Sequence, residues 1–317
     1  MILLLTSILA ITLRAGTSLV FATIGEIYTE KSGVLNLGIE GIMLMSAVLS
    51  FTVSYYTGNL FAAVVTAMAT GAVLSLLHAF LSITMRAQQV VSGLSITLFG
   101  TGMASFLGQT LGPESNSGYM IGLTAAKFET LTIPGLSKLP VIGAVFNQDL
   151  LTYIVLLLIP VAWYFMFRTK YGLNLRAVGE SPQTADAMGI DVTRTRYIYT
   201  IFGGIMAGIG GAHLSLAYTP GWTENITGGR GWIVIALVIF SLWNPSRAIW
   251  GAILFGGINA VQFRLQASGA EIPAPVLNMM PYLVTIVVLI IITLWENRRR
   301  GTGTPAALGT PYQREEK

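Results

Sequence analysis

Long uninterrupted runs of apolar residues dominate the chain, and charged residues fall mostly between these runs. No Asp, Glu, Lys or Arg occurs from Gly41 to Met85, a stretch long enough for two membrane helices that the polar break at 56–59 divides. A helix needs about 20 mostly apolar residues to cross a bilayer. The pattern predicts about nine spanning helices, with eight or ten as alternatives, at 2–24, 35–56, 60–84, 89–110, 150–168, 197–218, 231–244, 247–264 and 276–295.

The composition is that of an integral membrane protein. Of the 317 residues, 53% are hydrophobic and 10% are charged, whereas about 25% are charged in an ordinary soluble domain. This excludes a soluble enzyme with a polar surface, and it excludes a disordered chain. Cysteine is absent, so disulfides and Cys-ligated zinc are excluded. The two histidines, His78 and His213, lie far apart in apolar stretches, and we expect packed, hydrogen-bonded side chains there and no metal site.

The distribution of positive charge predicts the orientation of the chain. Most of the 18 Lys and Arg residues fall in loops on the side of the C-terminus, and cytoplasmic loops of membrane proteins carry such an excess. We therefore expect one transmembrane domain over residues 1–298, a cytoplasmic loop at 168–196 and a cytoplasmic tail at 299–317. The segment 111–149 is then external. Its apolar part contains prolines and is expected to lie along the membrane interface without spanning.

Two segments of the chain resemble each other. Residues 41–51 and 231–241 are similar, and each follows a Gly-rich polar stretch. In the nine-span scheme they enter the membrane from opposite sides, which predicts an inverted repeat with a first copy at about 33–110 and a second at about 227–295. Transporters use this architecture, and their substrate sites lie at interrupted helices. The alternative is that glycine is simply frequent in membrane helices.

Ionisable side chains inside predicted spans are candidate functional residues, because they are costly in lipid and usually face an interior or a cavity. Arg14 lies centrally in the first span. Glu40 follows Asn36 by four residues, a spacing that places both side chains on one face of a helix. Two interpretations stay open. Asn36 and Glu40 line or brace a translocation path, or Glu40 pairs with Arg14 or caps a broken helix end.

A cluster of glycines at 203–211 invites comparison with nucleotide-binding motifs. A dinucleotide fingerprint needs a preceding strand and a βαβ unit, and neither fits inside an uncharged apolar run. The spacing of Gly204 and Gly208 instead predicts close helix packing in the membrane. The chain also contains no Walker A sequence, so it does not bind ATP through such a loop.

The charged loop that follows the fifth predicted span contains signals for a short helix. Ser181 is a suitable N-cap, Pro182 suits the first helical position and Gly189 suits the residue just past the end. These signals predict a two-turn helix at 182–188, and a cap for the next helix follows at 191–193. A short capped helix between two spans is typical of a knob that docks into a partner's groove. A plain connector is the alternative.

The same loop resembles a known family. The run Arg176-Ala-Val-Gly-Glu180, followed by Ala185 and by Met188-Gly-Ile190, resembles the coupling-loop signature of ABC importer permeases of the branched-chain amino acid, ribose and nucleoside type. Further similarity, to the smaller permease of bacterial nucleoside importers served by a basic-membrane-protein-type lipoprotein, lies in the blocks 25–45, 89–94, 219–231 and 243–245. The resemblance covers about residues 10–298.

The resemblance implies an all-α, polytopic permease fold in the bacterial cytoplasmic membrane. Such a subunit is no enzyme and has no catalytic residue, metal or cofactor of its own. The implied partners are a second permease, a cytoplasmic ABC ATPase that binds ATP and Mg, and an external substrate-binding lipoprotein. The residues implied to couple to the ATPase are Arg176, Gly179, Glu180, Pro182, Ala185, Met188 and Gly189.

The implied activity is import of nucleosides by alternating access. A nucleoside is neutral and polar, so its path requires amides, hydroxyls and aromatic faces more than charges. Asn36, Asn259 and Gln262 are candidate hydrogen-bonding residues on the two repeat halves, together with Glu40. A simple sugar such as ribose is the rival substrate, and a stand-alone secondary transporter is the rival class.

Overall fold

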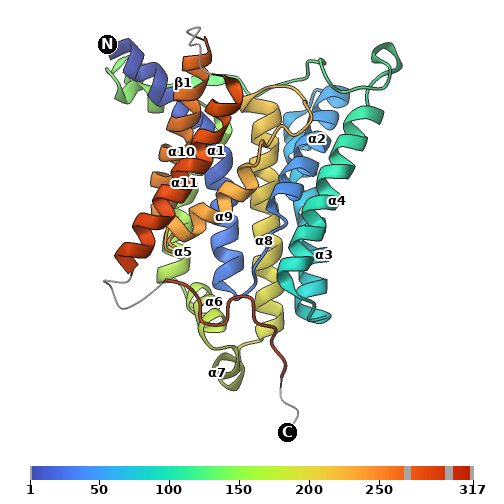
Figure 1. Cartoon of the computed structure of the whole chain (residues 1–317), viewed down its shortest axis with the longest axis vertical. Helices are drawn as coiled ribbons and strands as arrows, with labels where there is room; N and C mark the ends of the chain where they lie inside the picture. Colours follow the sequence, from blue (N-terminus) through green and yellow to red (C-terminus); the bar gives the residue numbers. More distant parts are fainter. Residues whose placement is uncertain (1, 268–272, 297–302, 315–317) are drawn as a thin grey trace.

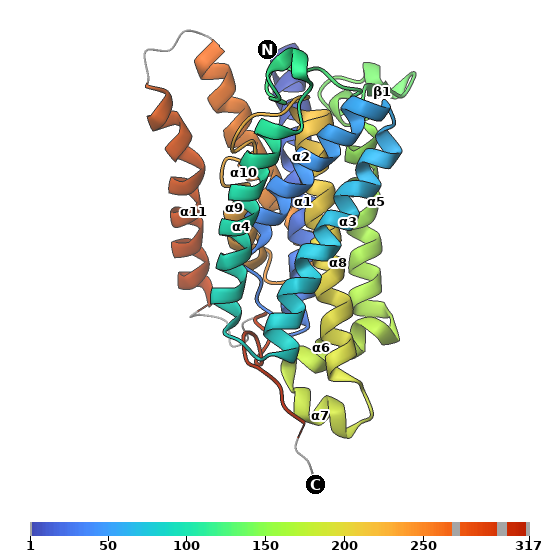
Figure 2. The same ribbon diagram turned by 90° about the vertical axis from the view of Figure 1, so that its right-hand side faces the viewer.

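The computed structural model describes residues 2–267, 273–296 and 303–314. They form a bundle of long helices (Figures 1 and 2). The helices are α1 Ile2–Lys31, α2 Ile39–Thr57, α3 Leu60–Ala79, α4 Gln89–Thr110, α5 Leu150–Arg168, α6 Lys170–Glu180, α7 Pro182–Ala187, α8 Val192–His213, α9 Arg230–Phe240, α10 Pro245–Ala267 and α11 Ala274–Glu296. One π-helical turn each extends α3 and α8, at Phe80–Thr84 and Leu214–Tyr218.

Several of these helices can cross a membrane. In the described part of the chain, seven are long and apolar enough to do so: α1 to α5, α8 and α10. This confirms the predicted polytopic membrane protein. The predicted number of about nine spans is approximate, because α9 has only 11 residues. At 1.5 Å per residue it covers about 16 Å, which is too short for a hydrocarbon core of about 30 Å.

Most connections between the helices lie at two opposite ends of the bundle, apart from those that lead into α2 and α9 (Figure 1). One end carries the N-terminal part of α1 and the segment 111–149. The other end carries α6, α7 and the C-terminal segment 303–314. The segments expected inside and outside the cell therefore lie at opposite ends, as the nine-span scheme requires. Which end faces the cytoplasm stays a prediction.

The segment 111–149 contains no long helix. It consists of irregular backbone, short 3₁₀ turns at Glu114–Asn116, Leu136–Lys138 and Ile142–Phe146, and an antiparallel hairpin of β1 Thr130–Thr132 with β2 Asn147–Asp149. This small hairpin is the one departure from the all-α expectation among the described residues. The segment does not span the bundle.

A buried carboxylate fixes the end of the hairpin to the bundle. Asp149 caps α5 by accepting hydrogen bonds from the backbone N and the hydroxyl of Thr152, at 3.0 and 2.7 Å, and its carboxylate lies 3.5 Å from Nε2 of His213. Burial by itself would raise the pKa of Asp149, but the contacts with His213 and Thr152 outweigh burial and lower it below its ordinary value.

Glycines allow the central helices to approach closely. A Cβ atom built on Gly204 of α8 would lie 2.3 Å from the carbonyl oxygen of Gly71 in α3, and one on Gly208 would lie 2.3 Å from that of Ala67. The predicted packing role of Gly204 and Gly208 is thereby confirmed. The contact between α1 and α10 is built in the same way, since a Cβ on Gly256 would lie 2.3 Å from the carbonyl oxygen of Thr12.

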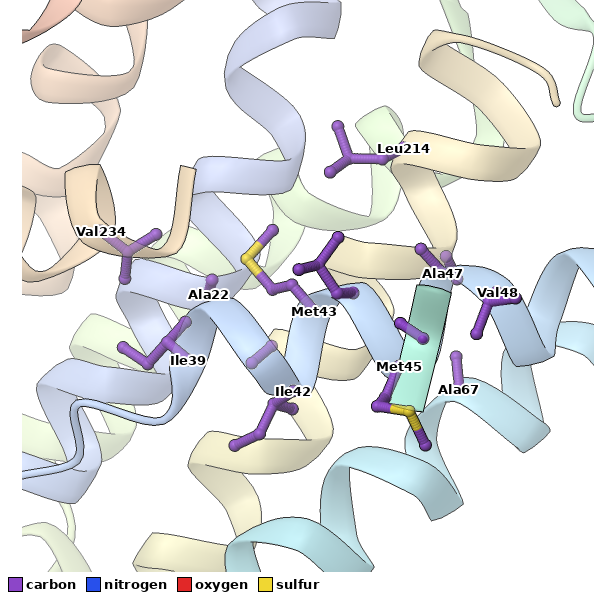
Figure 3. Packing of buried hydrophobic residues seen from close by; sticks show 14 of the residues in the cluster. Ala22, Ile39, Ile42, Met43, Met45, Ala47, Val48, Ala67, Leu214 and Val234 are labelled. Atoms are coloured by element: carbon purple, nitrogen blue, oxygen red, sulfur yellow. The ribbon is translucent and has the colours of Figure 1, made fainter. Parts of the chain in front are cut away.

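The helix α2 is buried on most of its circumference. Figure 3 shows Ile42 and Met43 of α2 in a cluster of buried side chains that also includes Ala67 of α3 and Val234 of α9. Both α2 side chains are fully buried. A helix that is apolar all round belongs in the interior of a bundle, and this position brings the first turn of α2 next to α9.

The packing of α3 against α8 yields a prediction on stability. Gly71→Val would place its first added carbon 2.0 Å from the carbonyl oxygen of Gly204, and overpacking of this kind costs about 1–3 kcal/mol. We expect a lower melting temperature of the purified protein in detergent. Gly102→Val in α4 is the matched control, because nothing lies within 4 Å of its Cβ position. Equal melting temperatures for the two variants would show that α3 and α8 do not need this close approach.

Candidate functional site

Two helices begin inside the bundle, and their N-terminal ends meet there. After α1 ends, the irregular turn at 32–38 rises from the α6–α7 end toward the start of α2 (Figure 1). The predicted helix at 35–56 therefore starts later than expected, at Ile39. One reason is local. The side chain of Asn36 accepts a hydrogen bond from the backbone N of Gly38 at 2.8 Å, which holds a turn where a helix was expected.

Irregular backbone at membrane depth is tolerated only where protein groups form hydrogen bonds with its N–H and C=O groups. Side chains of three helices form such bonds with the turn 32–38. The backbone N of Leu35 donates to Oε1 of Gln89 at 2.7 Å, and its carbonyl oxygen lies 3.1 Å from Nε2 of His78. The backbone N of Asn36 donates to Oε1 of Glu26 at 3.2 Å. The expectation that His78 is a packed, hydrogen-bonded residue is confirmed.

The carboxylate of Glu40 joins the two helix starts. It lies in the first turn of α2, and its Oε1 accepts hydrogen bonds from the hydroxyl of Thr227 at 2.5 Å and from the backbone N of Gly229 at 3.0 Å. Its Oε2 accepts from the backbone N of Gly231 at 2.6 Å. The acid thus caps the start of α9, where a helix presents unpaired N–H groups and a positive dipole end. Among the described residues, no ion pair joins Glu40 to Arg14.

We call the place where Glu40 joins the starts of α2 and α9 the junction. A cavity of about 610 Å³ lies beside it. Three of the four residues predicted for the translocation path line it together: Glu40 of α2 and Asn259 and Gln262 of α10. Asn36 lies outside the lining, with 1% of its surface exposed and its side chain engaged in the turn. The cavity therefore brings together polar side chains that are more than 200 positions apart in the sequence.

The rest of the lining adds neutral polar groups and aromatic rings. Sequence reasoning did not identify these residues, although Trp232 lies in the segment 231–241 that resembles residues 41–51. Tyr282 of α11 also donates to the carbonyl oxygen of Gly228 at 3.0 Å and holds the loop before α9. The added hydroxyls, amide and aromatic rings belong to Thr97, Thr101, Thr227, Asn225, Trp232 and Tyr282.

Among the described residues of this lining, the one cation has its own partners. Arg230 is buried, and its Nη1 donates to the carbonyl oxygen of Ala15 at 2.9 Å. Its guanidinium also lies 4.8 Å from the ring centre of Tyr218, a cation–π contact. With Arg230 and Glu40 both bound to protein groups, the lining suits a neutral polar solute.

The loop after α5 folds into two short helices, α6 and α7, at the end of the bundle where the C-terminal segment lies (Figure 2). The predicted helix at 182–188 is confirmed as α7, where Ser181 accepts a hydrogen bond from the backbone N of Thr184. Gly189 follows with φ of 81°, a left-handed conformation that glycine adopts readily. Asp191 caps α8 by accepting from the backbone N of Arg194 at 2.8 Å, so the predicted cap is also confirmed.

Sequence reasoning missed the helix α6 at Lys170–Glu180. The signal was present, since Leu175 and Val178 are buried and three residues apart, as on one face of a helix. Below, we call α6 and α7 together the knob.

The residues predicted to couple to an ATPase fall into two groups. Met188, Glu180 and Gly189 are exposed, and 78% of the surface of Met188 is accessible. Ala185 is 3% exposed and packs against Val178 and Val192. The small side chain at Ala185 therefore shapes the interior of the knob.

The remaining predicted coupling residues lie on the inner side of the knob. Gly179 and Pro182 are buried. The guanidinium of Arg176 is half-buried and lies 5.2 Å from the ring centre of Phe167 in α5. Arg176 and Gly179 therefore contact the bundle, at Phe167 and at the backbone of Lys31.

A helical membrane bundle with a polar cavity at two interrupted helices is the architecture of a membrane transport protein. Comparison with known proteins defines the family. The chain belongs to the family of permease components of branched-chain amino acid transport systems, which matches residues 8–293. The resemblance deduced from the coupling loop is thereby confirmed, and the chain is a multi-pass membrane permease.

Three relatives are similar over nearly their whole length. A putative glucose ABC transporter permease protein of Haloferax volcanii is 39% identical, over 96% of each chain. A guanosine ABC transporter permease protein of Bacillus subtilis is 31% identical, over 97% of each chain. A nucleoside ABC transporter permease protein of Lactococcus lactis is 34% identical, over 86% of this chain and 88% of that protein. All three names describe permease subunits of ABC transporters.

The junction yields a prediction for Glu40→Gln. The amide keeps the size of the side chain but offers one acceptor oxygen in place of two, so at least one of the three donors loses its partner. A buried unsatisfied donor costs about 1–3 kcal/mol. We expect a lower melting temperature and reduced uptake by the assembled transporter. Glu114→Gln, at an exposed position, is the control. Wild-type stability and uptake in Glu40→Gln would rule out a need for the carboxylate.

Proposed function

We propose that the chain is the membrane subunit of an ATP-driven importer that moves nucleosides across the cytoplasmic membrane, with its C-terminus in the cytoplasm. The observation that carries this proposal is the cavity at the junction of α2 and α9. Its hydroxyls, amides and aromatic rings match a neutral solute with a flat base and a hydroxyl-rich sugar. The relatives named for guanosine and nucleoside transport support the same substrate class.

The geometry suggests how such a substrate binds. Trp232 and Tyr282 are partly exposed in the lining and offer ring faces to a base. Stacking of a base on an aromatic side chain is worth about 1–3 kcal/mol. Asn259 and Thr101 lie in the same lining and can exchange hydrogen bonds with the base edge or the ribose hydroxyls.

The importer requires further subunits in this proposal. A cytoplasmic ATPase binds the knob and supplies the site for ATP and Mg²⁺, since the sequence of this chain has no Walker A motif. A second permease pairs with this one, and a lipoprotein delivers substrate from outside. The exposed tip of the knob supports the first of these contacts.

A simple sugar is the second candidate substrate. The relative with 39% identity is named as a putative glucose permease, and a sugar would use the same amides and hydroxyls of the lining. The two candidates differ in what they need from the aromatic rings, because a flat base gains more from stacking than a pyranose does.

Uptake measurements distinguish the two substrates. We expect labelled guanosine or uridine to be taken up by cells that contain the complete transporter, and unlabelled glucose or ribose not to compete. Trp232→Ala should reduce nucleoside affinity by about tenfold or more, because 1.4 kcal/mol corresponds to a factor of ten. Trp250→Ala is the matched control, since Trp250 is exposed and lies outside the lining. Uptake of glucose without nucleoside uptake would favour the sugar candidate.

The contact with the ATPase is tested at the tip of the knob. Met188→Asp would place an unpaired charge in the contact, and burying a charge without a partner is costly. We expect the ATPase no longer to co-purify with the permease. Met188→Leu keeps an apolar side chain of similar size at the same position and should retain the ATPase. Normal co-purification of the Asp variant would show that the knob is only a connector.

A further inference from the structure

The C-terminal segment 303–314 lies across the end of the bundle that carries the knob (Figure 1). We call this segment the strap. The backbone N of Ala307 in the strap donates to the carbonyl oxygen of Gly179 in the knob, at 2.9 Å. The backbone N of Gly309 donates to the carbonyl oxygen of Gly33, in the turn 32–38, at 3.1 Å. The strap thus bonds both to the knob and to the turn that precedes α2.

Two more contacts fix the ends of the strap. Lys31, the last residue of α1, donates through Nζ to the carbonyl oxygen of Gly303 at 2.6 Å. At the other end, Arg314 forms an ion pair of 3.1 Å with Asp186 of α7. The second contact is exposed, so it contributes little to stability, but it shows that the strap follows the knob as far as α7.

Arg196 forms hydrogen bonds with both the turn 32–38 and the strap. It lies in the first turns of α8, the helix that follows the knob directly, and only 1% of its surface is exposed. Its Nε donates to the carbonyl oxygen of Ser32 at 3.2 Å, and its Nη1 donates to that of Thr310 in the strap at 3.0 Å. One buried guanidinium therefore holds the turn and the strap in a fixed relation to α8.

The turn 32–38 leads directly to the cavity. Its first residues, Ser32 and Gly33, are bonded to Arg196 and the strap, and it ends at the start of α2. Glu40 lies in the first turn of α2, where it bonds to the start of α9 and lines the cavity. The turn is therefore the covalent connection between the strap contacts and the capping carboxylate.

We propose that Arg196 and the strap position the turn 32–38, so that movement of the knob reaches Glu40 and changes the cavity. This inference rests on the proposed function, because the movement comes from an ATPase bound to the knob. Arg196 acts as a positioning residue in this scheme and does not touch the transported solute.

The absence of cysteine from the chain permits a direct test. Thr101→Cys introduces a single thiol in the cavity lining, and its rate of modification by a maleimide is measured in the assembled transporter with and without ATP. We expect ATP to change this rate. In Arg196→Gln on the same background, the ATP-dependent change should shrink by about fivefold or more, the lower end of ordinary coupling factors, while the ATPase still co-purifies and hydrolyses ATP.

Three further variants separate positioning from simple stabilisation. Arg194→Gln removes the same charge from an exposed position in the same helix and should respond to ATP like the parent. Arg196→Lys keeps the charge with fewer donors and should restore part of the response. Deletion of residues 303–317 removes the strap while leaving α8 intact and should abolish the response to ATP. This variant tests the inference even if Arg196→Gln fails to insert into the membrane.

Two results would overturn the inference. A normal ATP response in the deletion variant would show that the strap is dispensable, and loss of the ATPase from that variant would show that the strap serves docking instead. The readouts need no transported substrate, so an error in the substrate class leaves them valid. Failure of the ATPase to bind the intact permease would instead overturn the proposed function, and this inference with it.

Discussion

The structure depends on one carboxylate placed between two helix starts. A helix that begins in the middle of a membrane has several backbone N–H groups without partners, and lipid offers none. Glu40 accepts hydrogen bonds from two backbone N–H groups and one hydroxyl of the segment that starts α9, although it belongs to α2. Without such a group α9 could not begin at this depth, and the cavity would lose the wall that this helix start provides.

Close packing of α1 and α8 makes room for this junction. A Cβ atom built on Gly25 of α1 would lie 2.7 Å from the carbonyl oxygen of Gly203 in α8. Beside these two helices in close contact, α2 packs against α8 and α9 packs against α1. The hydrophobic effect contributes little to helix association inside a bilayer, so contacts between small residues and satisfied polar groups must supply the specificity.

The sequence predicted some parts of this architecture well, for physical reasons. Long apolar runs and the capping residues Ser181 and Asp191 act locally, so the spans and α7 could be predicted from pattern alone. Asn36 was placed wrongly on a helix. Its bond to Gly38 is local, but the irregular turn around it also needs partners far along the chain, such as Gln89, which accepts from the backbone N of Leu35. Ala185 was among the residues implied to couple to the ATPase, but it is buried because the unforeseen α6 packs against it. Contacts distant in sequence leave no periodic signal.

The position of Glu40 also bears on the kind of solute that the cavity accepts. Helix N-termini in interrupted transporter helices commonly attract anionic groups of a substrate. Here the start of α9 is already occupied by a carboxylate of the protein, and Arg230 is engaged by Ala15 and Tyr218. An amino acid substrate would bring a second carboxylate toward Glu40 and meet no uncommitted cation in the described lining. The charges of this junction therefore favour a neutral solute, even in a family whose name refers to branched-chain amino acids.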